Sequence, residues 1–273
     1  MNLEGLFEWG TATDTGRVRS NNEDALAVDT SLGVFVLADG MGGHKGGEIA
    51  SNLAITSLLD RLRQTLPPLK PGQLDEALGY THESIAIREA VIHANRTIYE
   101  SAQAQPQYEG MGTTLVVAVF YDNRLSIAHV GDSRIYRLRN DQLEQITSDH
   151  TMLQELIDRG FYTEEEAQRS MHRNLVTRAL GVEGSVAVDI QEELVLPGDL
   201  YLLCSDGLHD LVGDAQLAER LAACTDLNQC AQTLVDDANN QGGKDNISLI
   251  LARPIGDFPA KRRWYARVGN WFR

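Results

Sequence analysis

The sequence of 273 residues lacks long hydrophobic runs, has few cysteines and carries no excess of basic residues. No apolar stretch approaches the ~20 residues that a membrane-spanning helix needs, and no signal peptide is visible at the N-terminus. The three cysteines are odd in number and lack metal-site spacing, which is typical of a reducing compartment. We therefore expect a cytoplasmic protein.

The charge balance is acidic. The 24 basic residues against 39 acidic residues give a formal net charge of −15, which argues against a general nucleic-acid binder and suits a site that concentrates cations. Hydrophobic residues make up 42% and charged residues 23%, as is ordinary for a soluble enzyme. The length favours one large domain with a full core over two smaller domains.

The segment from Gly33 to His44 combines a strand pattern with an acid and several glycines. Its apolar run is continuous, as in a strand buried on both faces, and stops at Asp39. Gly40 and the glycines after it let the backbone approach whatever the Asp39 carboxylate binds. Taken alone, the segment would be an ordinary strand followed by a glycine turn.

Similar acids recur at the edges of other predicted strands: Glu23, Asp24, Asp132, Asp206 and Asp245. Asp206 repeats the plan of Asp39, since it follows the apolar run that ends at Cys204. Asp132 is either a hairpin-turn residue or a further ligand. Buried carboxylates without partners are costly, so a cluster of them indicates a bound cation. Ligands that are all oxygens suit Mg²⁺ or Mn²⁺.

Arg19 stands five residues before Asp24, with a polar turn between them. A guanidinium beside acids is either a structural ion pair or a bidentate donor to a phosphate group. The sequence leaves both interpretations open.

Apolar periodicity predicts two long helices, at about residues 49–62 and 81–103, before a β-rich block. The β pattern is interrupted near residues 148–181, where a helix is expected between Asp149 and Gly160 and strand-like sequence returns from Asn174. A helical excursion at this point predicts a flap over the site. Two further helical patterns follow, at about residues 214–223 and 227–240.

Six short motifs together resemble those of the metal-dependent protein phosphatases, the PPM family or protein phosphatase type 2C, in its compact bacterial form. In chain order they are Asn22-Glu23-Asp24, Asp39-Gly40-Met41-Gly42-Gly43-His44, Gly112-Thr113-Thr114, Gly131-Asp132-Ser133-Arg134, Ser205-Asp206-Gly207 and Asp245-Asn246. The resemblance implies an α+β fold. We expect a four-layer α-β-β-α sandwich of two central, mostly antiparallel sheets flanked by helices, with the flap near residues 148–181. The catalytic domain is expected at residues 1–255 and a basic aromatic tail at residues 256–273.

The resemblance also implies two or three Mn²⁺ or Mg²⁺ ions per chain. The first metal would be held by Asp39, Asp206 and Asp245. Asp39 would bridge to the second metal, whose other ligands are implied to be the Gly40 carbonyl, Glu23 and Asp24.

Two more residues take roles from the resemblance. Asp132, together with Asp206, resembles the ligands of a third, weaker metal. Arg19 matches the arginine that binds the substrate phosphate. Two neighbouring ions can share one water and lower its pKa towards neutrality, so that it attacks phosphorus in line without a phosphoenzyme.

The general acid is left open by the sequence. Eukaryotic members of the family have a histidine directly after the Asp-Gly pair, where this chain has Met41. His44 is either the acid that protonates the leaving alkoxide or a loop histidine that caps the following helix. The flap also departs from a common bacterial pattern, since Ser170-Met171 stand where a His-Pro pair often occurs.

The predicted function is that of a serine/threonine protein phosphatase, whose substrates are phosphorylated proteins and which opposes a bacterial Ser/Thr kinase. The alternative is a catalytically silent phosphatase-like module that binds phosphoproteins or senses a signal. The presence of every expected acid favours the enzyme. Another two-metal phosphoesterase, such as a nuclease, would need a basic track that this chain lacks.

Basic and aromatic residues crowd the end of the chain, from Lys261 to Arg273. Such a tail either packs on its own acidic domain or contacts a membrane surface or a partner protein. We expect a monomer.

Overall fold

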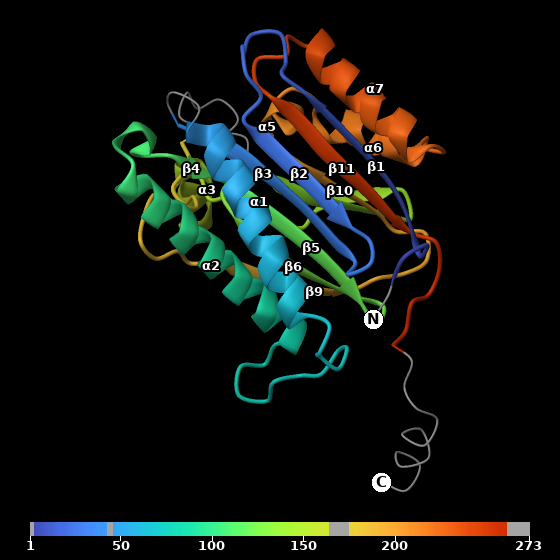
Figure 1. The fold of residues 1–273 in the computed structure, drawn as a ribbon. Helices are drawn as coiled ribbons and strands as arrows, with labels where there is room; N and C mark the ends of the chain where they lie inside the picture. The colour runs from blue at the N-terminus through green and yellow to red at the C-terminus, as the bar shows by residue number, and fades with distance from the viewer. Residues whose placement is uncertain (1–2, 43–45, 164–174, 261–273) are drawn as a thin grey trace, which may run out of the picture.

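Two antiparallel sheets lie face to face at the centre of the molecule (Figure 1). The structure is a computed structural model that describes residues 3–42, 46–163 and 175–260. Within these ranges the larger sheet pairs its strands in the order β2 (Asp24–Asp29), β3 (Val34–Met41), β5 (Leu115–Tyr121), β6 (Arg124–Val130) and β9 (Asp189–Leu194), with β4 (Gly112–Thr113) beside the end of β3. The smaller sheet has the order β1 (Phe7–Asp14), β11 (Ile247–Pro254), β10 (Leu200–Cys204), β7 (Arg134–Arg139) and β8 (Gln142–Gln145).

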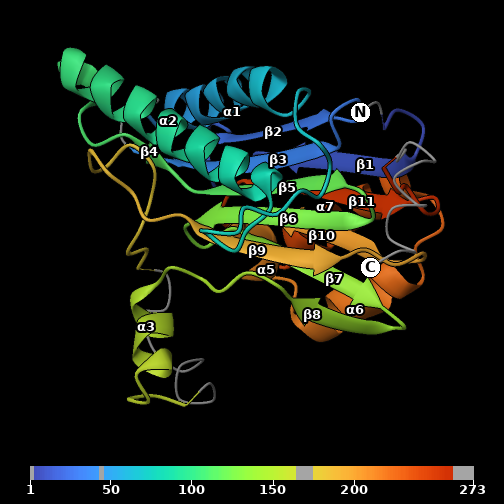
Figure 2. The same cartoon turned by 90° about the horizontal axis from the view of Figure 1, so that it is seen from below.

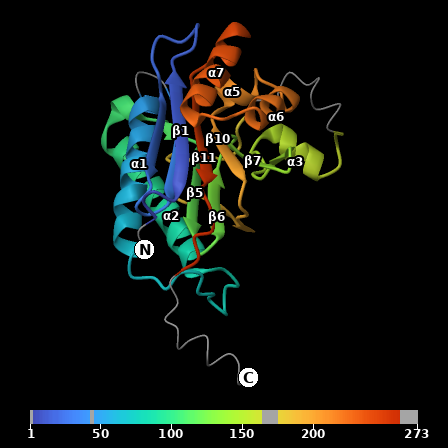
Figure 3. The same cartoon turned by 90° about the vertical axis from the view of Figure 1, so that its right-hand side faces the viewer.

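Helices cover the outer face of each sheet, on opposite sides of the strands (Figure 3). The larger sheet is covered by α1 (Gly46–Thr65) and α2 (His82–Ala104), and the smaller sheet by α6 (Asp214–Ala222) and α7 (Leu227–Asn240). Three short helices complete the described elements: η1 (Pro106–Tyr108), α3 (Met152–Asp158) and α5 (Asp206–His209). The predicted four-layer α-β-β-α sandwich is confirmed.

The side chains of β3 show how the layers pack against one another. Alternate residues of a strand face opposite sides of its sheet, and both sides of β3 are buried. Val34 and Val36 pack with apolar residues of α1 and α2, whereas Phe35 and Leu37 pack between the two sheets. A strand covered on both faces needs no polar alternation, which explains the continuous apolar run in the sequence.

The packed part of the chain extends into the expected tail. The hairpin between β5 and β6 turns at Asp122 and Asn123, both with positive φ, as two-residue hairpin loops prefer. Their side chains accept hydrogen bonds from the backbone N–H groups of Ala260 and Phe258, and the Phe258 ring is buried beside Phe7. The first residues of the expected tail, up to residue 260, therefore contact the domain.

The flap begins as predicted and then departs from the prediction. Thr151 caps α3 by accepting a hydrogen bond from the backbone N–H of Gln154, and the chain leaves the helix near Gly160, which has a positive φ. Figure 2 shows α3 standing away from the sandwich. The strand expected from residue 174 is wrong for its described part, residues 175–181.

That segment pairs one residue at a time with two different partners, so no continuous ladder forms. Val176 bridges to Thr151, and Leu180 bridges to Thr113. Residues 164–174, with Ser170 and Met171, lie outside the described ranges. Over the ranges that are described, no helix is long and apolar enough to cross a bilayer.

Candidate active site

The predicted acids come together at one end of the sandwich, from both sheets. Asp24 opens β2 and lies opposite Asp39 of β3 in the register of the larger sheet. Asp206 begins α5 directly after β10, and Asp245 directly precedes the Asn246 that leads into β11. Asp132 follows β6 after a glycine of positive φ. Neighbouring strands of a sheet end side by side, and the two sheets lie face to face. Residues far apart in the sequence therefore converge at this end of the sandwich.

The Gly-Thr-Thr motif holds the backbone of Asp39. The Asp39 N–H donates to Thr114 Oγ1 at 3.1 Å, and the Asp39 carbonyl accepts from the Thr114 N–H at 2.8 Å and from Thr113 Oγ1 at 2.8 Å. Both threonines are buried, so the Asp39 carboxyl projects from a rigid base. This contact gives a structural role to a motif whose individual residues carried no predicted chemistry.

The electrostatics of the cluster are those of negative charges forced together. Burial, and then the neighbouring carboxylates of Asp24 and Asp206, raise the pKa of Asp39 well above its ordinary value. Burial and the Asp132 carboxylate likewise raise the pKa of Asp206. Burial raises the pKa of Asp132 itself to about 6. A cation in their midst would reverse this repulsion, because it favours the ionised form of every carboxyl.

Two further observations indicate that these residues suit a divalent metal ion. The first concerns Asp24. Asp24 Oδ2 accepts a hydrogen bond from Ser205 Oγ at 2.9 Å. Its other oxygen, Oδ1, is buried without a hydrogen-bond partner among the described residues. A buried carboxylate oxygen left without a donor is costly unless a cation binds it.

The second observation is a cradle at the start of α1. A side chain at Gly47 would place its Cβ 2.8 Å from both Glu23 Oε2 and the Gly40 carbonyl oxygen. Two oxygens thus converge on a position that only glycine leaves free. Together with Asp24 and Asp39 they form an all-oxygen donor set, which suits Mg²⁺ or Mn²⁺ rather than a softer metal.

Arg19 lies at the edge of the cluster, paired with an acid. Its NH2 group donates to Asp245 Oδ2 at 2.6 Å, and the Arg19 side chain is 52% exposed. The pKa of Arg19 is raised, chiefly by this hydrogen bond and by the charge of Asp245. Arg19 thus forms an ion pair with Asp245, and its exposure leaves the guanidinium accessible from solvent.

Asn246 organises the loop that carries Arg19 and Glu23, a role that the sequence reasoning missed. Its Nδ2 donates to the carbonyls of Thr15 and Asn21 at 3.0 and 2.8 Å, and its Oδ1 accepts from the Glu23 N–H at 2.8 Å. One side chain thereby satisfies three backbone groups of a loop without regular structure. The only signal in the sequence was an amide directly after an acid at a strand entrance.

His209 is a second residue that was missed. It lies in α5 with its side chain buried, and its Nε2 donates to the Asp132 carbonyl at 3.1 Å. Burial and the charge of Arg134 hold the pKa of His209 well below its ordinary value, so the ring stays neutral. His209 therefore fixes the backbone at Asp132 without adding charge. The predicted general acid, His44, lies outside the described residues.

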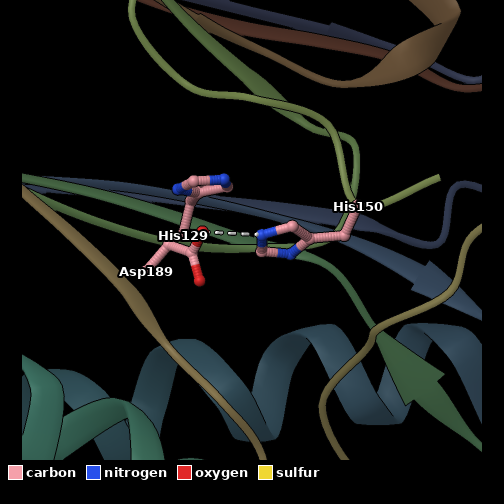
Figure 4. Close-up of side chains that lie close together, drawn as sticks. All are labelled: His129, His150 and Asp189. Carbon is pink, nitrogen blue, oxygen red and sulfur yellow. Dashed lines mark ion pairs between the residues drawn. The ribbon is translucent and has the colours of Figure 1, made fainter. Parts of the chain in front are cut away.

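A separate cluster of His129, His150 and Asp189 lies at the root of the flap (Figure 4). The two imidazole rings stack at 4.5 Å, and His150 Nε2 lies 3.3 Å from Asp189 Oδ2. Their spacing could hold a metal ion, but the hydrogen bonds favour another role. His150 Nδ1 accepts from the Gly131 N–H at 3.0 Å, so the neutral ring carries its proton on Nε2 and has no lone pair there for a metal.

Arg178 supplies the positive charge that such a metal would bring. Its NH1 group donates to Asp189 Oδ1 at 2.6 Å and also lies 3.0 Å from His150 Nε2. Further backbone bonds join His150 to Gly131 and to Thr177 of the flap. The cluster therefore fastens the flap to the segment that carries Asp132.

Known proteins resemble this chain in both sequence and fold. A sequence profile of the family described as protein phosphatase 2C matches residues 14–246. The serine/threonine phosphatase stp of Listeria innocua is 37% identical over 242 residues, which cover 88% of this chain and 92% of that protein. The crystal structure of the Mycobacterium tuberculosis serine/threonine phosphatase PstP/Ppp is 38% identical, with a TM-score of 0.80, and the match covers 90% of this chain and 98% of that chain.

A structure of the catalytic domain of PstP in complex with two manganese ions is 37% identical to this chain, with a TM-score of 0.75, over 90% of this chain and 97% of that one. The predicted fold class is confirmed by these likenesses, and so is the prediction of an active serine/threonine phosphatase over a silent module. On sequence and on fold alike, the chain belongs to the protein phosphatase 2C family.

Proposed function

We propose that this chain hydrolyses phosphoserine and phosphothreonine in proteins with two or three Mn²⁺ or Mg²⁺ ions held by the converging carboxylates. The observation that carries the proposal is that acids from both sheets lie so close together that desolvation and the neighbouring carboxylates raise the pKa of Asp39 and of Asp206. Asp39, Asp206 and Asp245 would hold the first ion. The second would take Asp39, Asp24 and the two oxygens that surround the cradle at Gly47, which are the Gly40 carbonyl oxygen and Glu23 Oε2.

Asp132 and Asp206 would hold the third, weaker ion. Support comes from their mutual electrostatics, since Asp132 is the carboxylate that raises the pKa of Asp206 most. Asp132 is also 6% exposed and is fixed through its carbonyl by His209, so a ligand at this position is rigid.

When bound, such ions lower the pKa of a shared water and neutralise charge on the phosphoryl group. The chain itself contributes position and charge. Thr113 and Thr114 fix Asp39, and Arg19 donates to the equatorial phosphate oxygens, on which charge resides in the transition state. Its planar fork suits two oxygens at once.

No covalent phosphoenzyme is needed in this scheme. Cys204 ends β10 beside the site, but its side chain is fully buried. Burial raises the pKa of the Cys204 thiol to about 12, so it is not a thiolate at neutral pH and does not serve as a nucleophile. His44 is proposed as the general acid for the leaving alkoxide, with helix capping as its alternative role.

The biological setting follows from the class of reaction. A bacterial Ser/Thr kinase is the proposed counterpart, acting on the same cytoplasmic phosphoproteins and itself among the substrates, with the phosphatase as a monomer. Phe258 and Ala260 keep the start of the proposed tail on the domain, so residues 261–273 are the part left to contact a membrane or partner. Liposome sedimentation of the full chain and of a chain ending at residue 260 tests the membrane contact, which equal behaviour would exclude.

The activity is tested by hydrolysis of p-nitrophenyl phosphate and of phosphopeptides with Mn²⁺, Mg²⁺ or a chelator. Asp39→Asn and Asp206→Asn are expected to be inactive under all three conditions. Turnover that persists in the chelator would refute the metal-dependent mechanism.

A further inference from the structure

A groove of about 310 Å³ opens between the end of β3 and the segment that leads from the flap to β9. Its volume is at the small end of ligand pockets, which occupy about 300–1,000 Å³. Six of its ten lining residues are apolar, namely Met41, Val176, Ala179, Val182, Val186 and Ala187, and the other four are Thr177, Arg178, Glu183 and Ser185. None of these residues takes part in the metal site described above.

The groove adjoins the metal site directly. Met41 is the last residue of β3 and follows Gly40, whose carbonyl is a proposed ligand. Consecutive Cα atoms lie about 3.8 Å apart, and an extended peptide advances about 3.3 Å per residue. A substrate whose phosphate sits at the metals therefore brings the side chains next to its phosphoresidue to this groove.

The far wall of the groove is held in place by hydrogen bonds. Leu180 and Thr113 exchange two backbone bonds, at 3.1 and 2.8 Å. Asn95 of α2, which is buried, accepts from the Gly181 N–H at 2.8 Å and donates to the Glu183 carbonyl at 3.0 Å. The groove is thus formed before any ligand arrives, as binding sites usually are.

The residues at the floor of the groove are also tightly packed. Gly112 of β4 pairs with Met41, and a Cβ on Gly112 would lie 2.9 Å from the Met41 methyl and 2.9 Å from Val182 Cγ2. Met41 and Val182 therefore meet over a glycine, with Val182 still 49% exposed. An exposed valine beside a methionine presents a small apolar surface to solvent.

The charged residues of the groove decide what it accepts. Arg178 is already bound to Asp189 at 2.6 Å and to the Ala187 carbonyl at 3.3 Å, so its charge is satisfied. Glu183 adds a negative charge to the same lining. A carboxylate entering the groove would meet Glu183 without a free cation to pair with, which disfavours acidic ligands.

We propose that this groove, between Met41 and residues 176–187, binds an uncharged apolar side chain of the phosphoprotein substrate, next to the phosphoresidue. The groove thereby selects among phosphoproteins by sequence. This inference rests on the proposed function of the neighbouring metal site.

The test compares phosphothreonine peptides that differ in one residue, Leu, Ser or Asp, at each of the two positions on either side. The wild-type enzyme is expected to prefer Leu over Asp at one of these positions by about 10-fold or more in kcat/KM, since pocket contacts of this size discriminate by roughly 10–200-fold. Val182→Asp should abolish that preference. Val182→Lys should shift it towards Asp.

The control variant is Leu196→Asp, because Leu196 is 46% exposed, much like Val182, but lies beyond the other end of β9. It should keep the wild-type preference. All variants should hydrolyse p-nitrophenyl phosphate at the wild-type rate, which shows that they are folded and metal-loaded.

The inference is overturned by equal kcat/KM for Leu and Asp at all four positions, or by a preference that both Val182 variants retain. A failure of the proposed function looks different. In that case neither p-nitrophenyl phosphate nor any peptide would be hydrolysed by the wild-type enzyme with Mn²⁺.

Discussion

Asp39 shows how much of the site depends on single residues. Its carboxyl is repelled by the neighbouring carboxyls of Asp24 and Asp206, and its backbone is held by hydrogen bonds from Thr113 and Thr114. The sequence marked Asp39 because an acid ended a buried strand. It gave no role to Asn246, although that residue lies in one of the six motifs, and it did not mark His209, because both side chains bond to backbone groups far away in the chain.

Replacing Asp39 with asparagine is expected to separate stability from activity. Removing one of several crowded negative charges should raise the free energy of unfolding of the chelator-treated protein at pH 7, on the order of 1 kcal/mol. The same change should lower kcat with Mn²⁺ by roughly 100-fold or more, because the charge that organises the site is lost. Urea unfolding and initial rates measure the two effects. A metal-free variant less stable than the wild type would contradict the repulsion.

His44 is best tested through the leaving group. A general acid contributes about 10²–10⁴-fold when the leaving oxygen needs a proton, as a serine alkoxide does and p-nitrophenolate does not. His44→Gln should therefore lose roughly 100-fold on phosphoserine peptides and little on p-nitrophenyl phosphate. His93→Gln, on the exposed face of α2, is the matched control. Equal losses on both substrates would assign His44 a structural role.

Among the helices and strands, the predictions from sequence were confirmed where the apolar pattern was long. The two long helices lie where apolar periodicity placed them, and β3, which carries Asp39, and β10, which precedes Asp206, lie where continuous apolar runs predicted strands. The strand expected from Asn174 failed because Val176 and Leu180 bridge to different partners, Thr151 and Thr113. Such pairing is decided by the tertiary fold, and an apolar run cannot reveal it.

The cluster at the flap root predicts a specific dependence of stability on pH. Burial, and then the charges of His129 and Arg178, lower the pKa of His150 to about 4, against about 6.5 in an unfolded chain. The unfolded state therefore binds more protons below pH 6.5, and the stability that His150 contributes is full above that pH and falls as pH drops towards 4.

His150→Asn removes this titration and keeps an acceptor for the Gly131 N–H. Between pH 7 and pH 5, the free energy of unfolding of the chelator-treated wild type should fall by about 2 kcal/mol relative to that of the variant. Comparing the two proteins cancels the opposite contribution of the aspartates at the metal site. Parallel pH profiles of the two proteins would show that His150 is protonated in the folded state as well.

At the scale of the whole molecule, the sandwich explains why six short motifs converge. The two sheets bring their strand ends to one end, and each motif lies at such an end or in the loop beside it. The net charge of −15 adds a field that concentrates divalent cations around the protein. The order of the motifs along the chain could be read from the sequence. Which of their oxygens lie close together could be seen only in the folded chain.

Calorimetric titration of the chelator-treated protein with Mn²⁺ tests the central claim directly. The wild type is expected to bind two or three ions per chain, and Asp39→Asn is expected to lose at least two of them, because Asp39 is the proposed bridging ligand. Leu196→Asp should bind as the wild type does. A wild type that binds no Mn²⁺, or an Asp39→Asn variant with unchanged stoichiometry and affinity, would contradict a metal centre built on these aspartates.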